Sequence, residues 1–182
     1  MTDAGRRRLL EIARASVEAA VRDAPLPRVD EADPELNVRQ GAFVSLHTGE
    51  ALRGCLGHFT SRQPLCRLVN ELARAAATED PRFASDRITP DELPRLRIEI
   101  SVLSPLRRIM NPLDIELGVH GIYVRRGYTS GCFLPQVATE TGWTKEEFLG
   151  YCCSHKAGLA ADAWKDPKTE VLVFTAEVFG ET

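Results

Sequence analysis

The 182-residue sequence lacks the motifs that mark several large enzyme and metal-site classes. It contains no G-x-x-x-x-G-K-[ST] loop, no G-x-G-x-x-G turn, no G-x-S-x-G elbow, no H-E-x-x-H helix and no C-x-x-C pair. The sequence therefore gives no support for P-loop nucleotide hydrolysis, dinucleotide chemistry, lipase-type hydrolysis or a zinc ribbon.

Long apolar runs and an excess of positive charge are also missing. No stretch approaches the roughly 20 apolar residues of a membrane span, and the N-terminus has charge without the apolar centre of a secretory signal. The net charge is −3, and the basic cluster at 6–8 is not interleaved with aromatic residues, so neither nucleic acid nor a membrane is an expected partner. Five cysteines form an odd set without framework spacing, which predicts reduced thiols in the cytoplasm.

Hydrophobic periodicity predicts an α+β fold with a mostly antiparallel sheet and flanking helices, in a single domain over 1–182. The helices expected from apolar spacing, capping boxes and prolines are 3–23, 64–79, a short helix from Pro90, 135–140 and 144–156. The strands expected from alternation are 41–48, 51–59, 95–104, 115–126, 129–134 and 170–179. Strands and helices do not alternate as βαβ units, which favours antiparallel pairing. The aliphatic residues of 95–104 share one side, so this strand is predicted to be central.

The strand segment Leu52–Gly57, LRGCLG, is the main candidate site. Alternation directs Leu52, Gly54 and Leu56 toward the core and Arg53, Cys55 and Gly57 the other way. A guanidinium two residues from a thiol on one face favours the thiolate. Gly54 and Gly57 would let another backbone or a small ligand come close. The alternative is a glycine-kinked strand with a small buried cysteine and a surface arginine.

Further candidates surround this segment. His58 is a possible general base for Cys55, but only if Gly57 bends the strand, because residues three apart on a strand face opposite ways. Glu99 and Ser101 lie on the polar side of their strand. Either Glu99 closes the sheet in a salt bridge with Arg53 or Arg82, or it is an acid that orients Cys55 or positions a substrate. His47, Cys55 and His58 have no carboxylate between them, so no metal site is predicted. The remaining thiols are expected to pack, with Cys152 in the core and Cys153 near the surface.

Several blocks along the chain resemble one family, the AMME chromosomal-region proteins, known in prokaryotes as AmmeMemoRadiSam system protein A. The blocks are LRGCLG (52–57), DPRF (80–83), LRIEISVLSPL (96–106), GVHGIYVRRG (118–127), FLPQVATETGW (133–143) and KAGL…W (156–164). The resemblance implies two unequal lobes, with 52–57 near the cleft between them, and a cytoplasmic protein. It also implies a Memo-like protein of the class III extradiol dioxygenase type and a radical SAM protein as partners. Arg107 and Arg108 depart from the family pattern, where an acidic residue is frequent.

These candidate residues lead to two hypotheses of function, which belong to different classes. The first is an enzyme or enzyme component that acts on an unknown small molecule, with Cys55 as thiolate, Arg53 stabilising it, and Glu99 and His58 handling protons. Gly54, Gly57, Arg82, Ser101 and Gln136 would contact the ligand. The second is a non-catalytic module that binds a small ligand or a partner peptide in the same cleft. Neither requires a cofactor or a metal.

Overall fold

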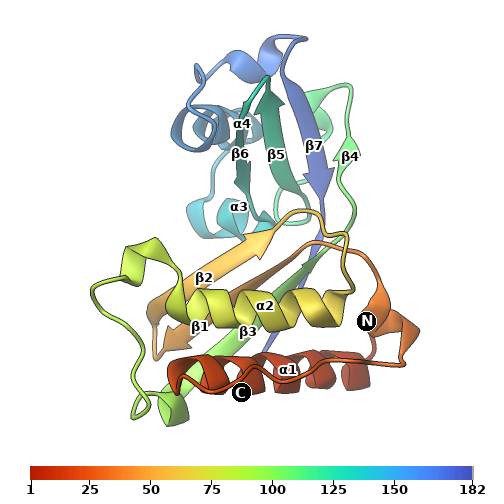
Figure 1. The fold of residues 1–182 in the computed structure, drawn as a ribbon. Coiled ribbons are helices and arrows are strands. Elements are labelled where there is room, and N and C mark those ends of the chain that lie inside the picture. The colour runs from red at the N-terminus through yellow and green to blue at the C-terminus, as the bar shows by residue number, and fades with distance from the viewer. Residues whose placement is uncertain (182) are drawn as a thin grey trace. The chain divides into compact units, whose positions relative to one another are not determined.

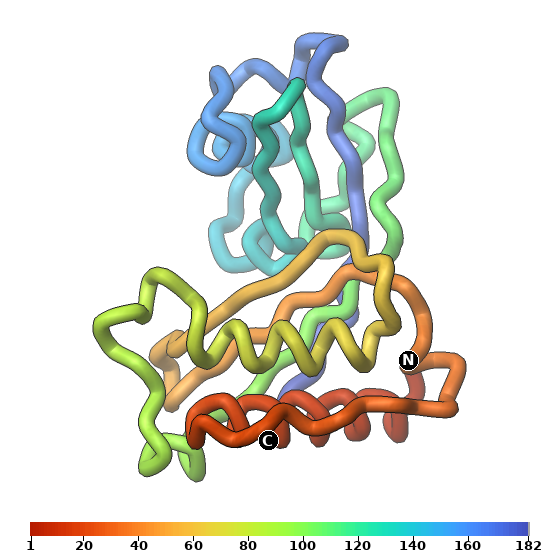
Figure 2. Tube along the Cα trace, viewed as in Figure 1, coloured from red at the N-terminus to blue at the C-terminus, as the bar shows by residue number. Residues whose placement is uncertain are grey.

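The computed structural model describes residues 1–181, which form an α+β fold with two four-stranded antiparallel sheets (Figures 1 and 2). The chain divides into two compact units, of which the second is Leu103–Ala176 and the first contains the remaining described residues. No helix within 1–181 is long and apolar enough to cross a membrane. The α+β, antiparallel prediction is confirmed, with two sheets in place of one.

The first unit packs two long helices on a sheet of order β2-β1-β3-β8, called here the first sheet. The helices are α1 (Asp3–Val21) and α2 (Leu65–Thr78), and the strands are β1 (Ala42–Thr48), β2 (Ala51–His58), β3 (Leu96–Leu103) and β8 (Ala176–Gly180). The helices lie side by side, as Figure 2 shows, and α2 packs on β1 and β2. Thr2 caps α1 by accepting a hydrogen bond from the Gly5 backbone, which satisfies one of the free amides of the first turn. Short 3₁₀ turns lie at Pro34–Asn37, Pro81–Phe83 and Leu93–Arg95.

The strand predicted at 95–104 is an interior strand of the first sheet, between β1 and β8. Leu96, Ile98, Ile100 and Val102 are all buried in the core beneath the two helices. The apolar alternation therefore identified both the element and its central position.

The second unit contains the second sheet, of order β4-β7-β5-β6, and its own core. Its strands are β4 (Arg107–Arg108), β5 (Gly121–Arg126), β6 (Thr129–Phe133) and β7 (Glu170–Phe174). Its helices are α3 (Pro135–Thr141) and α4 (Lys145–Tyr151), with 3₁₀ turns at Pro112–Asp114 and Ala163–Lys165. The predicted capping box at the start of α4 is present, since Thr144 and Glu147 each accept from the backbone of the other.

The structure corrects the predicted strand 170–179. It is two strands, β7 and β8, which belong to different sheets. Between them, the Thr175 amide donates to Ser104 Oγ (2.9 Å) and the Thr175 carbonyl accepts from the Ser104 amide (2.9 Å). An alternating apolar run does not show where the chain passes from one sheet to the other, because the side chains of both strands alternate with the same two-residue period.

Three local predictions also differ from the structure. The residues after Thr89 form a turn and not a capped helix, because the Glu92 carboxylate bonds to side chains elsewhere. Cys153 is buried, not near the surface, since the helix widens after Tyr151 into a π-turn over Cys152–Lys156. The strand predicted from 115 begins at Gly121, because the preceding residues form a turn.

Candidate functional site

A β-bulge interrupts the candidate segment. β1 and β2 pair regularly up to Leu46 opposite Gly54, and the next pair is His47 opposite Leu52. Arg53 is therefore the extra residue on β2, without a partner in the ladder. The bulge breaks the simple alternation that placed Arg53 and Cys55 on one face.

The Arg53 guanidinium is held by two carboxylates. Its Nε donates to Glu92 Oε1 (2.7 Å) and its Nη1 to Asp86 Oδ2 (2.7 Å), and Glu92 also accepts from Thr48 Oγ1 (2.7 Å). The hydrogen bond with Glu92 is the largest cause that raises the pKa of Arg53. Within residues 1–181 the guanidinium makes no hydrogen bond to Cys55. Asp86 and Glu92 balance the charge of Arg53, so its hydrogen bonds lend no support to the expected stabilisation of the thiol, which stays a prediction.

The two glycines of the segment allow close packing, as predicted. A Cβ on Gly54 would lie 2.0 Å from the Ala76 carbonyl oxygen of α2, and one on Gly57 would lie 2.3 Å from the Phe43 ring. Neither approach is possible for a residue with a side chain without displacement of the neighbour. At both positions the protein's own chain occupies the space, and contact of these glycines with a ligand stays a prediction.

Cys55 lies in a row of polar residues that crosses three strands. Ser45 on β1 is the register partner of both Cys55 on β2 and Glu99 on β3. Ser45 Oγ donates a hydrogen bond to Cys55 Sγ at 3.1 Å. We call Cys55, Ser45 and Glu99 the Cys55 row. Ser101 follows Glu99 on the same face of β3, opposite Phe43, and is buried.

Glu99 has no partner for its carboxylate within the described chain. Both predicted partners are engaged elsewhere: Arg53 with Asp86 and Glu92, and Arg82 with Asp80. The salt bridge expected for Glu99 is therefore absent from residues 1–181. What remains is a half-buried carboxylate next to Ser45, two strands from the Cys55 thiol.

Asp80 and Arg82, in the turn after α2, clamp the backbone of Cys55. Asp80, whose side chain is 2% exposed, accepts from the Cys55 amide (2.9 Å) and from Arg82 Nη2 (2.7 Å). Arg82 Nη2 also donates to the Cys55 carbonyl (3.1 Å). The hydrogen bond from Arg82 is the largest cause that lowers the pKa of Asp80, to about 2. The clamp therefore consists of a buried anion and a cation that bind the two backbone polar groups of one residue, Cys55.

Arg82, and not Arg53, is the cation beside the thiol. Its side chain is 56% exposed, and the Cys55 thiol is among the groups that raise the pKa of Arg82, after its main partner Asp80. Sequence reasoning selected Arg82 for ligand contact and overlooked Asp80. The sequence signal for Asp80 was the Asp-Pro start of the DPRF block, where an aspartate caps a turn through its own carboxylate.

His58 was expected to act as a base for Cys55 only if Gly57 bends the strand, and this bend is absent from β2. β2 pairs with β1 without a shift from Gly54 to His58, so Gly57 does not bend the strand. His58 is exposed and faces the side opposite to Cys55. Its role as a base beside the thiol is therefore corrected. Gln136 lies near the start of α3 in the second unit, and its contact with a ligand stays a prediction.

Residues 1–181 contain no group of three or more His, Cys, Asp or Glu side chains that could hold a metal ion. The chemically distinctive feature of the first unit is thus a half-buried thiol on a sheet face, with a hydroxyl, a guanidinium and an unpaired carboxylate around it.

An α+β protein with two antiparallel sheets and an LRGC segment on a bulged strand is the class that fold and site define. The AMMECR1 family model matches residues 10–179, and the chain belongs to that family. The resemblance seen in the sequence blocks is thereby confirmed.

Relatives match over nearly the whole chain. A protein of Nanoarchaeum equitans is 43% identical over 95% of this chain and 98% of its own length. A protein of Methanothermobacter thermautotrophicus is 41% identical over 96% of this chain and 93% of its own. The crystal structure of an uncharacterised protein from Pyrococcus horikoshii, 36% identical, superimposes with a TM-score of 0.88 and covers 100% of this chain and 93% of that one.

Proposed function

We propose that the protein is an enzyme, or a component of one, that acts on a small molecule at Leu52–Gly57 through the thiolate of Cys55. The observation that carries this proposal is the hydrogen bond from Ser45 Oγ to Cys55 Sγ, in a row that ends at Glu99, whose carboxylate has no partner within 1–181. A hydroxyl that donates to sulfur stabilises a thiolate, and a nearby guanidinium does the same. Arg82 takes the stabilising role first assigned to Arg53.

Each side chain has a role in this proposal. Cys55 is the nucleophile, and Ser45 orients its sulfur. Glu99 exchanges a proton with the substrate, since a half-buried carboxylate without a cationic partner is free to do so. Ser101 supplies a hydroxyl to the bound molecule from the neighbouring position on the same strand face.

Thiol reactivity tests the proposal directly. The pKa values of the other four thiols are raised by burial, that of Cys132 to about 11; these thiols are Cys66, Cys132, Cys152 and Cys153. A pH series of iodoacetamide labelling, resolved by peptide mass spectrometry, should show Cys55 as the fastest native thiol. Labelling in denaturant is the control, because there the five rates should converge. If native Cys55 labels no faster than Cys132, the thiolate proposal fails.

The non-catalytic binding module is the second candidate, and one observation favours it. Arg53, Gly54 and Gly57 all have structural partners: the guanidinium binds Asp86 and Glu92, and the glycines make room for α2 and Phe43. Most residues of the LRGC segment thus have a structural role that requires no catalysis. Under this alternative Cys55 packs, and Cys55→Ala should retain the function of the protein.

Metabolite profiling separates the two candidates. A deletion strain should accumulate the substrate of an enzyme, and a Cys55→Ala strain should reproduce that profile, whereas a binding module with the same substitution should restore the wild-type profile.

The Memo-like and radical SAM partners and the cytoplasmic location that the resemblance implies are part of the proposal. Co-purification of the tagged protein with a Memo-like or radical SAM protein would test the partners.

A further inference from the structure

The first unit has a groove that no residue of the Cys55 row lines, although Arg97 of the groove lies two residues before Glu99 on β3. Its volume is about 750 Å³, within the range of about 300–1,000 Å³ that small-molecule sites occupy. It is formed by one face of α1, the start of β3 and the end of the chain. We call it the arginine groove, and the residues that define it are Arg7, Leu10, Arg14, Arg95, Arg97 and Glu181.

Three of its guanidinium groups have no carboxylate partner among residues 1–181. Arg7, Arg95 and Arg97 are exposed and make no ion pair there, although other arginines of this chain are paired. Arg95 ends the 3₁₀ turn Leu93–Arg95 and Arg97 is the second residue of β3, so they flank the buried Leu96, and both line the groove. The groove therefore concentrates unbalanced positive charge from two elements that are far apart in sequence.

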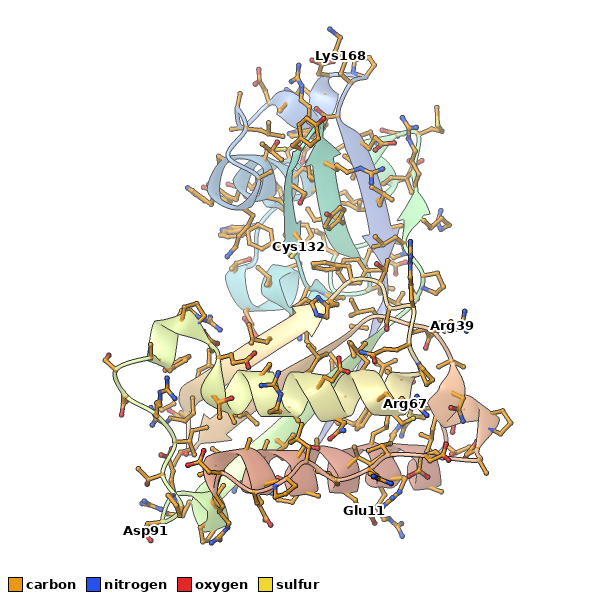
Figure 3. The ribbon with its side chains drawn as sticks, in the orientation of Figure 1. Glu11, Arg39, Arg67, Asp91, Cys132 and Lys168 are labelled. Carbon is orange, nitrogen blue, oxygen red and sulfur yellow. The ribbon has the colours of Figure 1, made fainter. Side chains whose placement is uncertain are left out.

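The acidic residues of the groove do not cancel this charge. Glu181 is paired with Arg14, whose guanidinium also donates to the Leu93 and Leu96 carbonyls. Glu11, labelled on α1 in Figure 3, is paired with Arg8 (2.9 Å). The Arg14–Glu181 pair ties α1 to the start of β3 and is a neutral part of the wall, whereas Arg7, Arg95 and Arg97 have no ion pair within 1–181.

We infer that the arginine groove binds a small polyanion that carries at least two phosphate or carboxylate groups. Guanidinium groups form bidentate hydrogen bonds with both kinds of oxyanion. Leu10 and Pro94 add an apolar surface for the rest of the molecule. No member of the Cys55 row lines the groove, so this inference stands or falls independently of the proposed enzyme activity.

Calorimetric titration of the full-length protein at constant ionic strength tests the inference. Tripolyphosphate is the phosphate probe and citrate the carboxylate probe, and the one that binds more tightly identifies the anionic group. The test variant is Arg95→Gln/Arg97→Gln, for which we expect a loss of affinity of about tenfold or more, because two charge-assisted contacts disappear. The matched control is Arg39→Gln/Arg62→Gln, which removes two exposed arginines of the same unit that also have no ion pair within 1–181. Arg39 is labelled in Figure 3.

The control variant should keep its affinity within about twofold, since only general screening of charge is changed. Thermal melts of both variants should match the wild-type, because none of the substituted side chains is paired or buried. The inference is overturned if neither probe binds the wild-type protein, or if the control variant loses as much affinity as the test variant. It is also overturned if a single-stranded oligonucleotide binds and both small probes do not.

Discussion

Cys55 of the first unit differs in its surroundings from the cysteines of the second unit, whereas Cys66 of the first unit is buried like most of them. In the first unit Cys55 is half-buried on a polar sheet face, with Ser45 donating to its sulfur and Arg82 beside it. In the second unit Cys132 on β6, labelled in Figure 3, and the fully buried Cys152 have pKa values raised by burial. The count of cysteines therefore says little about chemistry, and the local hydrogen bonds and exposure decide which thiol can react.

The surroundings of Cys55 differ from those of the buried thiols only if the first sheet, which carries the Cys55 row, keeps its structure. Ile100 lies between Glu99 and Ser101 on β3, and its side chain is fully buried on the opposite face. Replacing Ile100 with Ala should lower the free energy of unfolding by about 2–5 kcal/mol, as expected for a core aliphatic residue. Urea denaturation followed by circular dichroism measures the loss. A loss below about 1 kcal/mol would show that the sheet under the row is not part of the core.

The bulge explains what the sequence could and could not predict at the site. In a hairpin without a bulge, Ser45 would face Gly54; the extra residue Arg53 moves Cys55 into that place. The bulged residue Arg53 binds Asp86 and Glu92, more than thirty residues further along the chain. The alternation of apolar and polar residues within a segment gives no information about such distant partners. Ser45 and the two carboxylate partners of Arg53 could therefore not be identified from the sequence.

Helices and strands whose apolar residues recur at a regular spacing could be predicted from the sequence. The helices α1 and α2, the strand β3 and the cap of α4 follow from apolar spacing and capping residues, and all agree with the structure. The break at Thr175 was not predictable, because it is set by hydrogen bonds to Ser104 and not by the residue types around it. Glu99 and Ser101 were placed on the correct face because the period of β3 is unbroken.

In the first unit, Asp80 contributes a pH-dependent stabilisation at the Cys55 clamp. Its pKa falls from 3.8 to about 2 on folding, chiefly through Arg82, so its contribution is complete above about pH 5 and is lost as the pH falls through 4 toward 2. Asp80→Asn should therefore lower the free energy of unfolding at pH 7 by about 2 kcal/mol and flatten its decline between pH 4 and 2.

Asp91→Asn is the matched control for that measurement. Asp91 is exposed, and its carboxylate makes no hydrogen bond or ion pair within 1–181, so its removal should leave the pH profile unchanged. Urea melts at a series of pH values give both profiles. If Asp80→Asn and the control decline in parallel, the clamp does not stabilise the fold through its charge.

The smallest expected effect separates the two arginines near Cys55. Arg82 lies beside the thiol and is partly exposed, whereas Arg53 is held by two carboxylates. Arg82→Ala should slow iodoacetamide labelling of Cys55 by about threefold to tenfold near neutral pH, because an exposed cation stabilises the thiolate only modestly through water. Arg53→Ala should change the rate by less than about twofold, since the charge of Arg53 is already balanced.

Arg82→Lys distinguishes charge from geometry in this experiment. Lysine keeps the positive charge but not the fork that binds both Asp80 and the Cys55 carbonyl, so a rate close to wild-type would assign the effect to charge. A rate as low as that of Arg82→Ala would assign it to the clamp, with Cys55 displaced when its backbone is released. If Arg53→Ala slows labelling more than Arg82→Ala does, then the bulged arginine controls the thiol despite its two carboxylate partners. The contrast between Arg53, held by two carboxylates, and the exposed Arg82, paired with Asp80 alone, would then be wrong.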